Sequence, residues 1–112
     1  MSEKSVDNVT FRRYVATLRE ECSVDNAEIT VVRRANVYLG HHKAFGYTCV
    51  GETRDEGKIR ILSIVIDMHA TEAETQDTLI HEWAHAMTGD LLHSDAWGVA
   101  YAKCYRAFHD AS

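Results

Sequence analysis

The stretch of sequence that decides the fold runs from Thr71 to Gly89 and reads TEAETQDTLIHEWAHAMTG. It opens with a capping box, in which the Thr71 hydroxyl serves the free amides of the first turn and the Glu74 carboxylate reaches back to the cap. Apolar residues then recur at helical spacing, and Gly89 stands where helices commonly end in a left-handed residue. The pattern predicts one long helix across this stretch.

Apolar residues at helical spacing predict two further helices. The first follows a cap at Asp7, Asn8 or Thr10. Its apolar stripe consists of Phe11, Tyr14, Val15, Leu18 and Cys22. The second follows a cap at Ser94 or Asp95 and ends the chain. Its stripe consists of Trp97, Ala100, Tyr101, Cys104, Tyr105 and Phe108.

Between the first helix and Thr71, β-branched and aromatic residues predict three strands. These strands open at residues 29–32, cover 44–52 and cover 58–67. The polar residues 40–43 predict a loop, and the turn signal at 54–57 predicts that the last two strands form an antiparallel hairpin. Because the strands are grouped rather than alternating with helices, we expect an α+β fold with a small, mostly antiparallel sheet.

Length and composition limit the class of protein. A chain of 112 residues, 46% apolar and 26% charged, is typical of one globular domain covering 1–112. The formal net charge of −5 argues against an intrinsic nucleic-acid binder. The apolar stretch 59–66 is interrupted by Arg60 and Ser63 and is too short to span a bilayer. We expect no secretory signal, because Met1–Ser5 is polar and leads into a charged segment without an apolar region.

The three cysteines, Cys22, Cys49 and Cys104, are odd in number and form no CxxC pair. The number and spacing of the cysteines therefore argue against a disulfide framework and against a four-cysteine zinc site. We expect a cytoplasmic protein without a membrane segment.

The central helix contains His81-Glu82-Trp83-Ala84-His85, an HExxH motif. Two histidines four residues apart lie on one helix face, so both imidazoles can point at a single metal ion. Glu82 is turned by about 100° around the helix axis and lies beside such an ion, where it can take a proton from water. The alternative is that both histidines are ordinary core or surface residues.

A catalytic zinc ion usually has three protein ligands and an open fourth position. No glutamate follows Glu82, so a downstream glutamate ligand is excluded. The remaining candidates are Asp90, His93, Asp95, His109 and Asp110. A short reversal after Gly89 favours His93, with Asp95 next, whereas His109 lies roughly 24 Å further along a continuous helix.

Other polar residues are candidates for supporting roles. Asp77 and Asp95 are candidates to hold the imidazoles through hydrogen bonds, with helix capping or solvation as the alternative. The donors that could stabilise an oxyanion are Tyr47, Tyr101, Tyr105 or a spare histidine, and the sequence selects none of them.

At this point the chain resembles the SprT-like zinc metallopeptidases, a branch of the zincins with a minimal zincin-like fold. The matching text is Thr78-Leu79-Ile80-His81-Glu82-Trp83-Ala84-His85-Ala86, followed by His93-Ser94-Asp95-Ala96-Trp97. The likeness covers about Gly46 to Phe108 and is close to short members carried by bacteriophages of actinobacteria.

The resemblance implies that His81, His85 and His93 bind Zn²⁺ and that Glu82 is the general base of a peptidase acting on a protein or peptide. The sequence lacks the cysteine-rich zinc ribbon and the basic DNA-binding extension of better-known members, so it gives no ground for DNA-dependent activity. The metzincin pattern fits poorly, because Thr88 and Leu91 stand where it requires Gly and His.

Two functions from different classes follow from these residues. The first is a zinc-dependent metallopeptidase. The second is a non-catalytic, zinc-stabilised protein-binding module. Glu82 discriminates between them, because a purely structural zinc site has no use for a carboxylate beside the ion and usually closes its fourth position with Cys or His.

Overall fold

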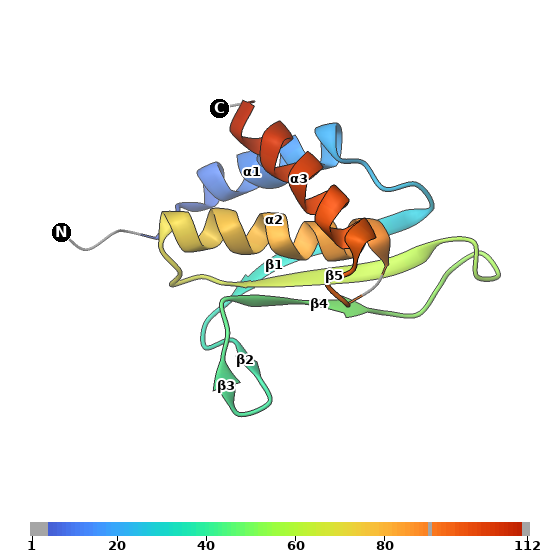
Figure 1. Ribbon diagram of the computed structural model, residues 1–112. Helices are drawn as coiled ribbons and strands as arrows, with labels where there is room; N and C mark the ends of the chain where they lie inside the picture. The colour runs from blue at the N-terminus through green and yellow to red at the C-terminus, as the bar shows by residue number, and fades with distance from the viewer. Residues whose placement is uncertain (1–4, 90, 111–112) are drawn as a thin grey trace.

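Three helices cover one face of a three-stranded sheet (Figure 1), in a computed structural model that describes residues 5–89 and 91–110. The helices are α1 (Asn8–Glu21), α2 (Glu72–Thr88) and α3 (Asp95–Asp110). The sheet contains β1 (Ala27–Arg34), β4 (Gly46–Val50) and β5 (Arg60–Asp67). The predicted α+β fold, with an N-terminal helix, a small sheet, the HExxH helix and a C-terminal helix, is confirmed.

Strand β5 lies at the centre of this sheet, in the order β1-β5-β4. It pairs antiparallel with β4, with Gly46 opposite Ile66, as the predicted hairpin requires. It pairs parallel with β1, with Ala27 opposite Arg60, and the sequence did not indicate this pairing. Of the three strand pairs in the described residues, two are antiparallel.

The segment between β1 and β4 corrects one prediction. We expected residues 40–43 to form a loop, but β2 (Tyr38–Leu39) and β3 (His42–Lys43) pair antiparallel there as a small ribbon. Gly40, at φ +64°, supplies the left-handed residue of the tight turn between them. The ribbon projects away from the helices (Figure 1).

The helix ends are formed by the residues that the sequence indicated. The Asp7 side chain accepts a hydrogen bond from the Thr10 amide and caps α1. Both hydrogen bonds of the Thr71–Glu74 capping box are present at the start of α2. Gly89, at φ +68°, ends α2 in the left-handed conformation, and the Ser94 hydroxyl accepts from an amide in the first turn of α3.

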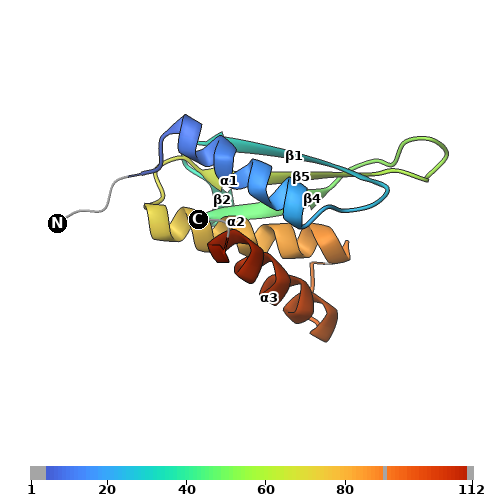
Figure 2. The same ribbon diagram turned by 90° about the horizontal axis from the view of Figure 1, so that it is seen from above.

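The core lies between the sheet and the helices (Figure 2). Leu62, Ile64 and Ile66 are fully buried on one face of β5, because alternate residues of a strand point to the same side. They belong to one cluster with Leu79, Ile80 and Trp83 of α2. The Trp83 Nε1 donates to the Cys22 carbonyl at 2.9 Å, which ties α2 to the end of α1. Packing on this side fixes the opposite side of α2, which carries the HExxH histidines.

No helix in the described part of the chain combines the length and apolar character that a membrane span requires.

Candidate metal centre

Helix α2 presents His81 and His85 side by side, one turn apart. Their Nε2 atoms lie 3.2 Å from each other, with the two ring centroids 4.9 Å apart. His85 is buried and His81 is partly buried. The helix buries the residues on its other sides in the core, so the two imidazoles share the remaining face.

The reversal after Gly89 brings a third imidazole to the same place. His93 lies between α2 and α3, and its Nε2 is 3.1 Å from that of His81. One possible ligand atom from each of the three histidines lies within 4.8 Å of the other two. The structure therefore brings together the three histidines that the sequence indicated.

The other candidates for a third ligand do not join this group within the described residues. Asp95 is exposed at the start of α3, and His109 and Asp110 lie at the opposite end of that helix. Asp90 lies outside the described residues.

The separations of His81 Nε2 from the His85 and His93 nitrogens match those at a tetrahedral zinc ion. Two nitrogens bound to zinc at about 2.0–2.1 Å lie about 3.3 Å apart when the angle between them is tetrahedral. The observed separations of 3.2 and 3.1 Å are close to that value. Three neutral imidazoles are also a donor set that zinc prefers. The residues present therefore fit the metal that the sequence implied.

Burial favours the neutral, metal-binding form of His81. Desolvation is the main cause that lowers the pKa of this imidazole below its usual value of 6.5. The Glu82 carboxylate opposes this by raising the pKa, while His85 and His93 lower it further.

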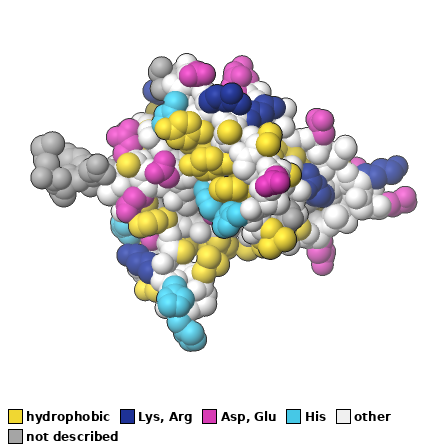
Figure 3. All heavy atoms as spheres, in the orientation of Figure 1, with side chains coloured by type: hydrophobic (Ala, Val, Ile, Leu, Met, Phe, Trp, Pro, Cys, Tyr) yellow, Lys and Arg dark blue, Asp and Glu magenta, His cyan; other side chains and the backbone are white. Residues whose placement is uncertain are grey.

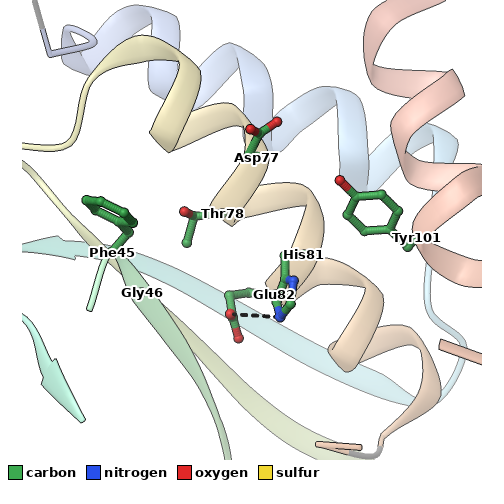
Figure 4. A pocket seen from close by; sticks show the side chains of 7 residues that line it. All are labelled: Phe45, Gly46, Asp77, Thr78, His81, Glu82 and Tyr101. Carbon is green, nitrogen blue, oxygen red and sulfur yellow. Dashed lines mark ion pairs between the residues drawn. The ribbon is translucent and has the colours of Figure 1, made fainter. Parts of the chain in front are cut away.

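Glu82 lies beside the three imidazoles and not among them (Figure 4). Its Oε2 is 3.9 Å from the His81 Nε2, the contact drawn as a dashed line. The residue is only 8% exposed, so a buried hydrogen-bond donor is needed to satisfy its carboxylate. Thr48 of β4 supplies that donor, with its Oγ1 2.7 Å from Oε1 and 3.2 Å from the Glu82 carbonyl oxygen.

Two residues that contact the site were not assigned roles from the sequence. Thr48 is separated from Glu82 by 34 positions, and a threonine in a strand carries no local signal of such a contact. The Trp97 ring packs against all three imidazoles, with centroid distances of 4.6–5.5 Å. The Trp97 Nε1 also donates to the His81 carbonyl at 3.3 Å. The sequence indicated Trp97 only as part of an apolar stripe and of the matching text.

A cleft of about 320 Å³ opens beside His81 and Glu82. Its other lining residues are Phe45, Gly46, Asp77, Thr78 and Tyr101. Figure 4 shows Tyr101 facing the cleft from α3, opposite Phe45 and Thr78. In Figure 3, histidine side chains reach the surface near the centre of the face shown, flanked by hydrophobic side chains.

Of the three tyrosines considered as donors, Tyr101 is the one that lines the cleft. Burial raises the pKa of its hydroxyl, and the negative charge of Asp77 raises it further, so the hydroxyl keeps its proton. The Asp77 carboxylate points away from His81 (Figure 4), and no hydrogen bond joins these two side chains in the described structure. The suggested role of Asp77 in holding an imidazole therefore has no support in the geometry.

Comparisons with protein-family models, with curated proteins and with solved structures find no match to this chain. The function must therefore be argued from the site itself.

Proposed function

We propose that this protein is a zinc-dependent metallopeptidase that hydrolyses peptide bonds, with Glu82 as the general base. One observation carries the proposal: three imidazole nitrogens converge within 4.8 Å, and a buried carboxylate lies beside them without joining them. The resemblance of the sequence to SprT-like metallopeptidases leads to the same proposal. We include a cytoplasmic location, because all three cysteines are free thiols, as expected in a reducing compartment.

His81, His85 and His93 would hold the metal ion, and Trp97 packs against all three rings and limits their movement. When bound, zinc supplies Lewis-acid chemistry that makes water acidic near neutral pH and polarises a carbonyl group. Glu82 Oε2 is the atom that accepts the proton of the attacking water and later passes it to the leaving amine. Thr48 holds the other oxygen of the same carboxylate.

The substrate would lie along β4, which forms the edge of the sheet next to the cleft. An edge strand has unpaired backbone amides and carbonyls, to which an extended peptide can bind as an additional strand. Tyr101, whose hydroxyl faces the same cleft from α3, would stabilise the developing oxyanion.

The deciding experiment measures bound zinc and cleavage of casein in the wild type and in Glu82→Gln. We expect both proteins to bind one zinc ion per chain and cleavage to fall by at least about 100-fold in the variant, the usual contribution of general acid–base catalysis. Glu20→Gln, an exposed residue of α1, is the matched control and should cleave like the wild type. Full cleavage by Glu82→Gln would reject the mechanism.

The ligand set has a separate test. His93→Ala should weaken zinc binding strongly, whereas His109→Ala, at the far end of α3, should leave it unchanged. Equal effects would reject His93 as the third ligand. A wild-type protein that holds zinc tightly and cleaves no peptide would instead support the zinc-stabilised binding module.

A further inference from the structure

A second hollow lies near the edge of the sheet opposite to β4 and the metal centre. It is a groove of about 630 Å³ between α1 and β1, which run alongside each other in Figure 2. One wall consists of Asn8, Phe11, Arg12, Val15, Ala16 and Arg19 of α1. These positions recur every three or four residues and therefore form a single stripe of the helix. We call this hollow the α1–β1 groove.

The other wall of the groove is formed mainly by β1, an edge strand of the sheet. Val31 and Val32 both line it, although consecutive residues of a strand point to opposite faces. At least one of the two residues therefore lines the groove near or through the backbone of β1. Among the described residues, β1 pairs only with β5, so its outer edge carries backbone groups that no described strand pairs with.

The groove is positively charged in a negatively charged protein. Three of its ten lining residues are arginines and none is acidic, although the whole chain has a formal charge of −5. The arginines come from both walls: Arg12 and Arg19 from α1, and Arg33 from β1. Glu28, the one acidic residue of β1, forms an ion pair with Arg54 and does not line the groove.

Arg33 is held in place at the floor of the groove. Its guanidinium lies over the Phe11 ring at 4.8 Å and donates to the Asn8 side chain and to the Met68 carbonyl. The Arg33 Nε is buried and has no hydrogen-bond partner in the described structure. The part-exposed guanidinium is thus a fixed cation that lines the groove between apolar side chains, which suits a carboxylate on an amphipathic partner.

A smaller hollow of about 180 Å³ continues the path along β1. It shares Arg19 with the α1–β1 groove and is lined by Ala27 and Ile29 of the same strand. The concave surface therefore follows β1 along most of its length, which matches the shape of an extended chain better than that of a compact ligand.

We propose that the α1–β1 groove binds an acidic, extended peptide segment of a partner protein, which adds to the free edge of β1 as a strand. Backbone hydrogen bonds to β1 would provide affinity, and pairing of acidic side chains with Arg12, Arg19 and Arg33 would provide specificity. This site is independent of the proposed peptidase activity, because β1 and β4 are opposite edges of the sheet.

The test uses the Glu82→Gln protein, so that cleavage cannot remove the probe. The probe is a fluorescein-labelled, end-capped peptide of about twelve residues that alternates Glu and Val, and its partner peptide alternates Lys and Val. We expect fluorescence anisotropy to show binding of the acidic peptide only, weakening as salt is added because salt screens exposed charges. The double variant Arg12→Gln/Arg19→Gln should bind it at least about tenfold more weakly.

Arg13→Gln is the matched control, because Arg13 is also an exposed arginine of α1 but does not line the groove. It should bind the acidic peptide like the parent protein. When the acidic peptide binds, hydrogen exchange should show new protection of amides in 27–34 and none in 46–50. N-methylation of alternate peptide bonds in the probe should abolish binding, because it removes the backbone donors.

Three results would overturn the proposal. The first is absence of binding, or equal binding by the double variant. The second is protection of β4 in place of β1. The third is single-stranded DNA of equal charge binding as tightly through the same arginines, which would identify a polyanion site.

Discussion

The two oxygens of the Glu82 carboxylate have different surroundings. Oε1 accepts a short hydrogen bond from Thr48, and Oε2 faces the imidazole of His81. One oxygen is therefore anchored, and the other stays available for proton transfer. A general base must be held within about 0.5 Å of its productive position, and a buried hydrogen bond is a direct way to achieve this.

Thr48→Val tests this anchoring. Valine has nearly the same shape but no hydroxyl, so the carboxylate loses its donor. A hydrogen bond to a charged group is worth about 1.5–3 kcal/mol, and we therefore expect kcat to fall by about tenfold or more with little change in KM. Thr48→Ser restores the hydroxyl and should recover most of the rate at unchanged zinc content. A valine variant as active as the serine variant would show that the contact does not position Glu82.

Gly46 permits the close approach of β4 to α2. A Cβ added there would lie 2.6 Å from the Val65 carbonyl oxygen and 2.8 Å from Cγ2 of Thr78. Gly46→Ala should therefore lower the free energy of unfolding in urea by about 1–3 kcal/mol, as overpacking does. Gly98→Ala is the control: nothing lies within 4 Å of its added Cβ, and alanine in a helix should stabilise by about 0.5–1 kcal/mol. Equal changes in the free energy of unfolding for the two variants would show that the close approach at Gly46 does not affect stability.

At the residue scale, the sequence indicated those site residues whose relationship is local. His81, Glu82 and His85 lie within two helical turns, where helix geometry alone fixes which side chains are neighbours. The approach of His93 depended on a single short turn. Thr48 was not indicated, because its contact joins residues on a strand and a helix that meet only in the folded chain.

At the scale of elements, the capping box of α2 fixes where the HExxH helix begins. The Thr71 hydroxyl accepts from the Glu74 amide at 3.2 Å, and the Glu74 carboxylate accepts from the Thr71 amide at 2.9 Å. These bonds satisfy two amides that the helix itself leaves without partners. The start of α2 therefore has a defined position relative to the end of β5.

Thr71→Ala removes one of these bonds. The free energy of unfolding should fall by about 1 kcal/mol, the usual value of an N-cap side chain. Thr53→Ala, in the exposed loop between β4 and β5, should change it by less than about 0.5 kcal/mol. Both values come from urea titrations followed by circular dichroism. If Thr71→Ala and Thr53→Ala unfold with the same free energy, the cap makes no measurable contribution to stability.

The three helices, their caps and the β4–β5 hairpin could be predicted, because periodicity, capping residues and a short turn are all local signals. The parallel pairing of β1 with β5 could not, because its partners lie 33 positions apart, as in Ala27 with Arg60, and no short turn specifies them. The β2–β3 ribbon was missed for a different reason: each of its strands is two residues long, too short to show alternation.

At the scale of the whole molecule, the fold separates two surfaces by the width of its sheet. The candidate metal centre and its cleft lie beside β4, and the α1–β1 groove lies at the other edge. β5 lies between them and is buried along most of its length. Each surface thus has a free strand edge next to it, while the central strand supplies the rigid support for both.

The reactivity of the thiols reports on the integrity of this packing. Cys22 and Cys104 are fully buried, and burial is the main cause that raises the pKa of both thiols. Cys49 on β4 is exposed. With a chromogenic disulfide reagent at pH 8, one thiol should react rapidly in the native protein and the other two only after denaturation. Cys49→Ser should remove the rapid phase. Three thiols reacting at one rate would contradict the packing of α1 against α3.

The parallel pairing of β1 and β5 has a consequence for synthesis of the chain. β1 leaves the ribosome well before β5, its strand partner within the described residues, because Arg34 precedes Asp67 by the same 33 positions that separate all their paired residues. Throughout that interval both edges of β1 are open to other chains, and a strand with open edges can pair with the wrong chain. When two copies of β1 pair parallel and in register, Arg33 and Arg34 at its end lie beside the same arginines of the other copy. Their repulsion would disfavour that pairing of nascent chains until β5 arrives.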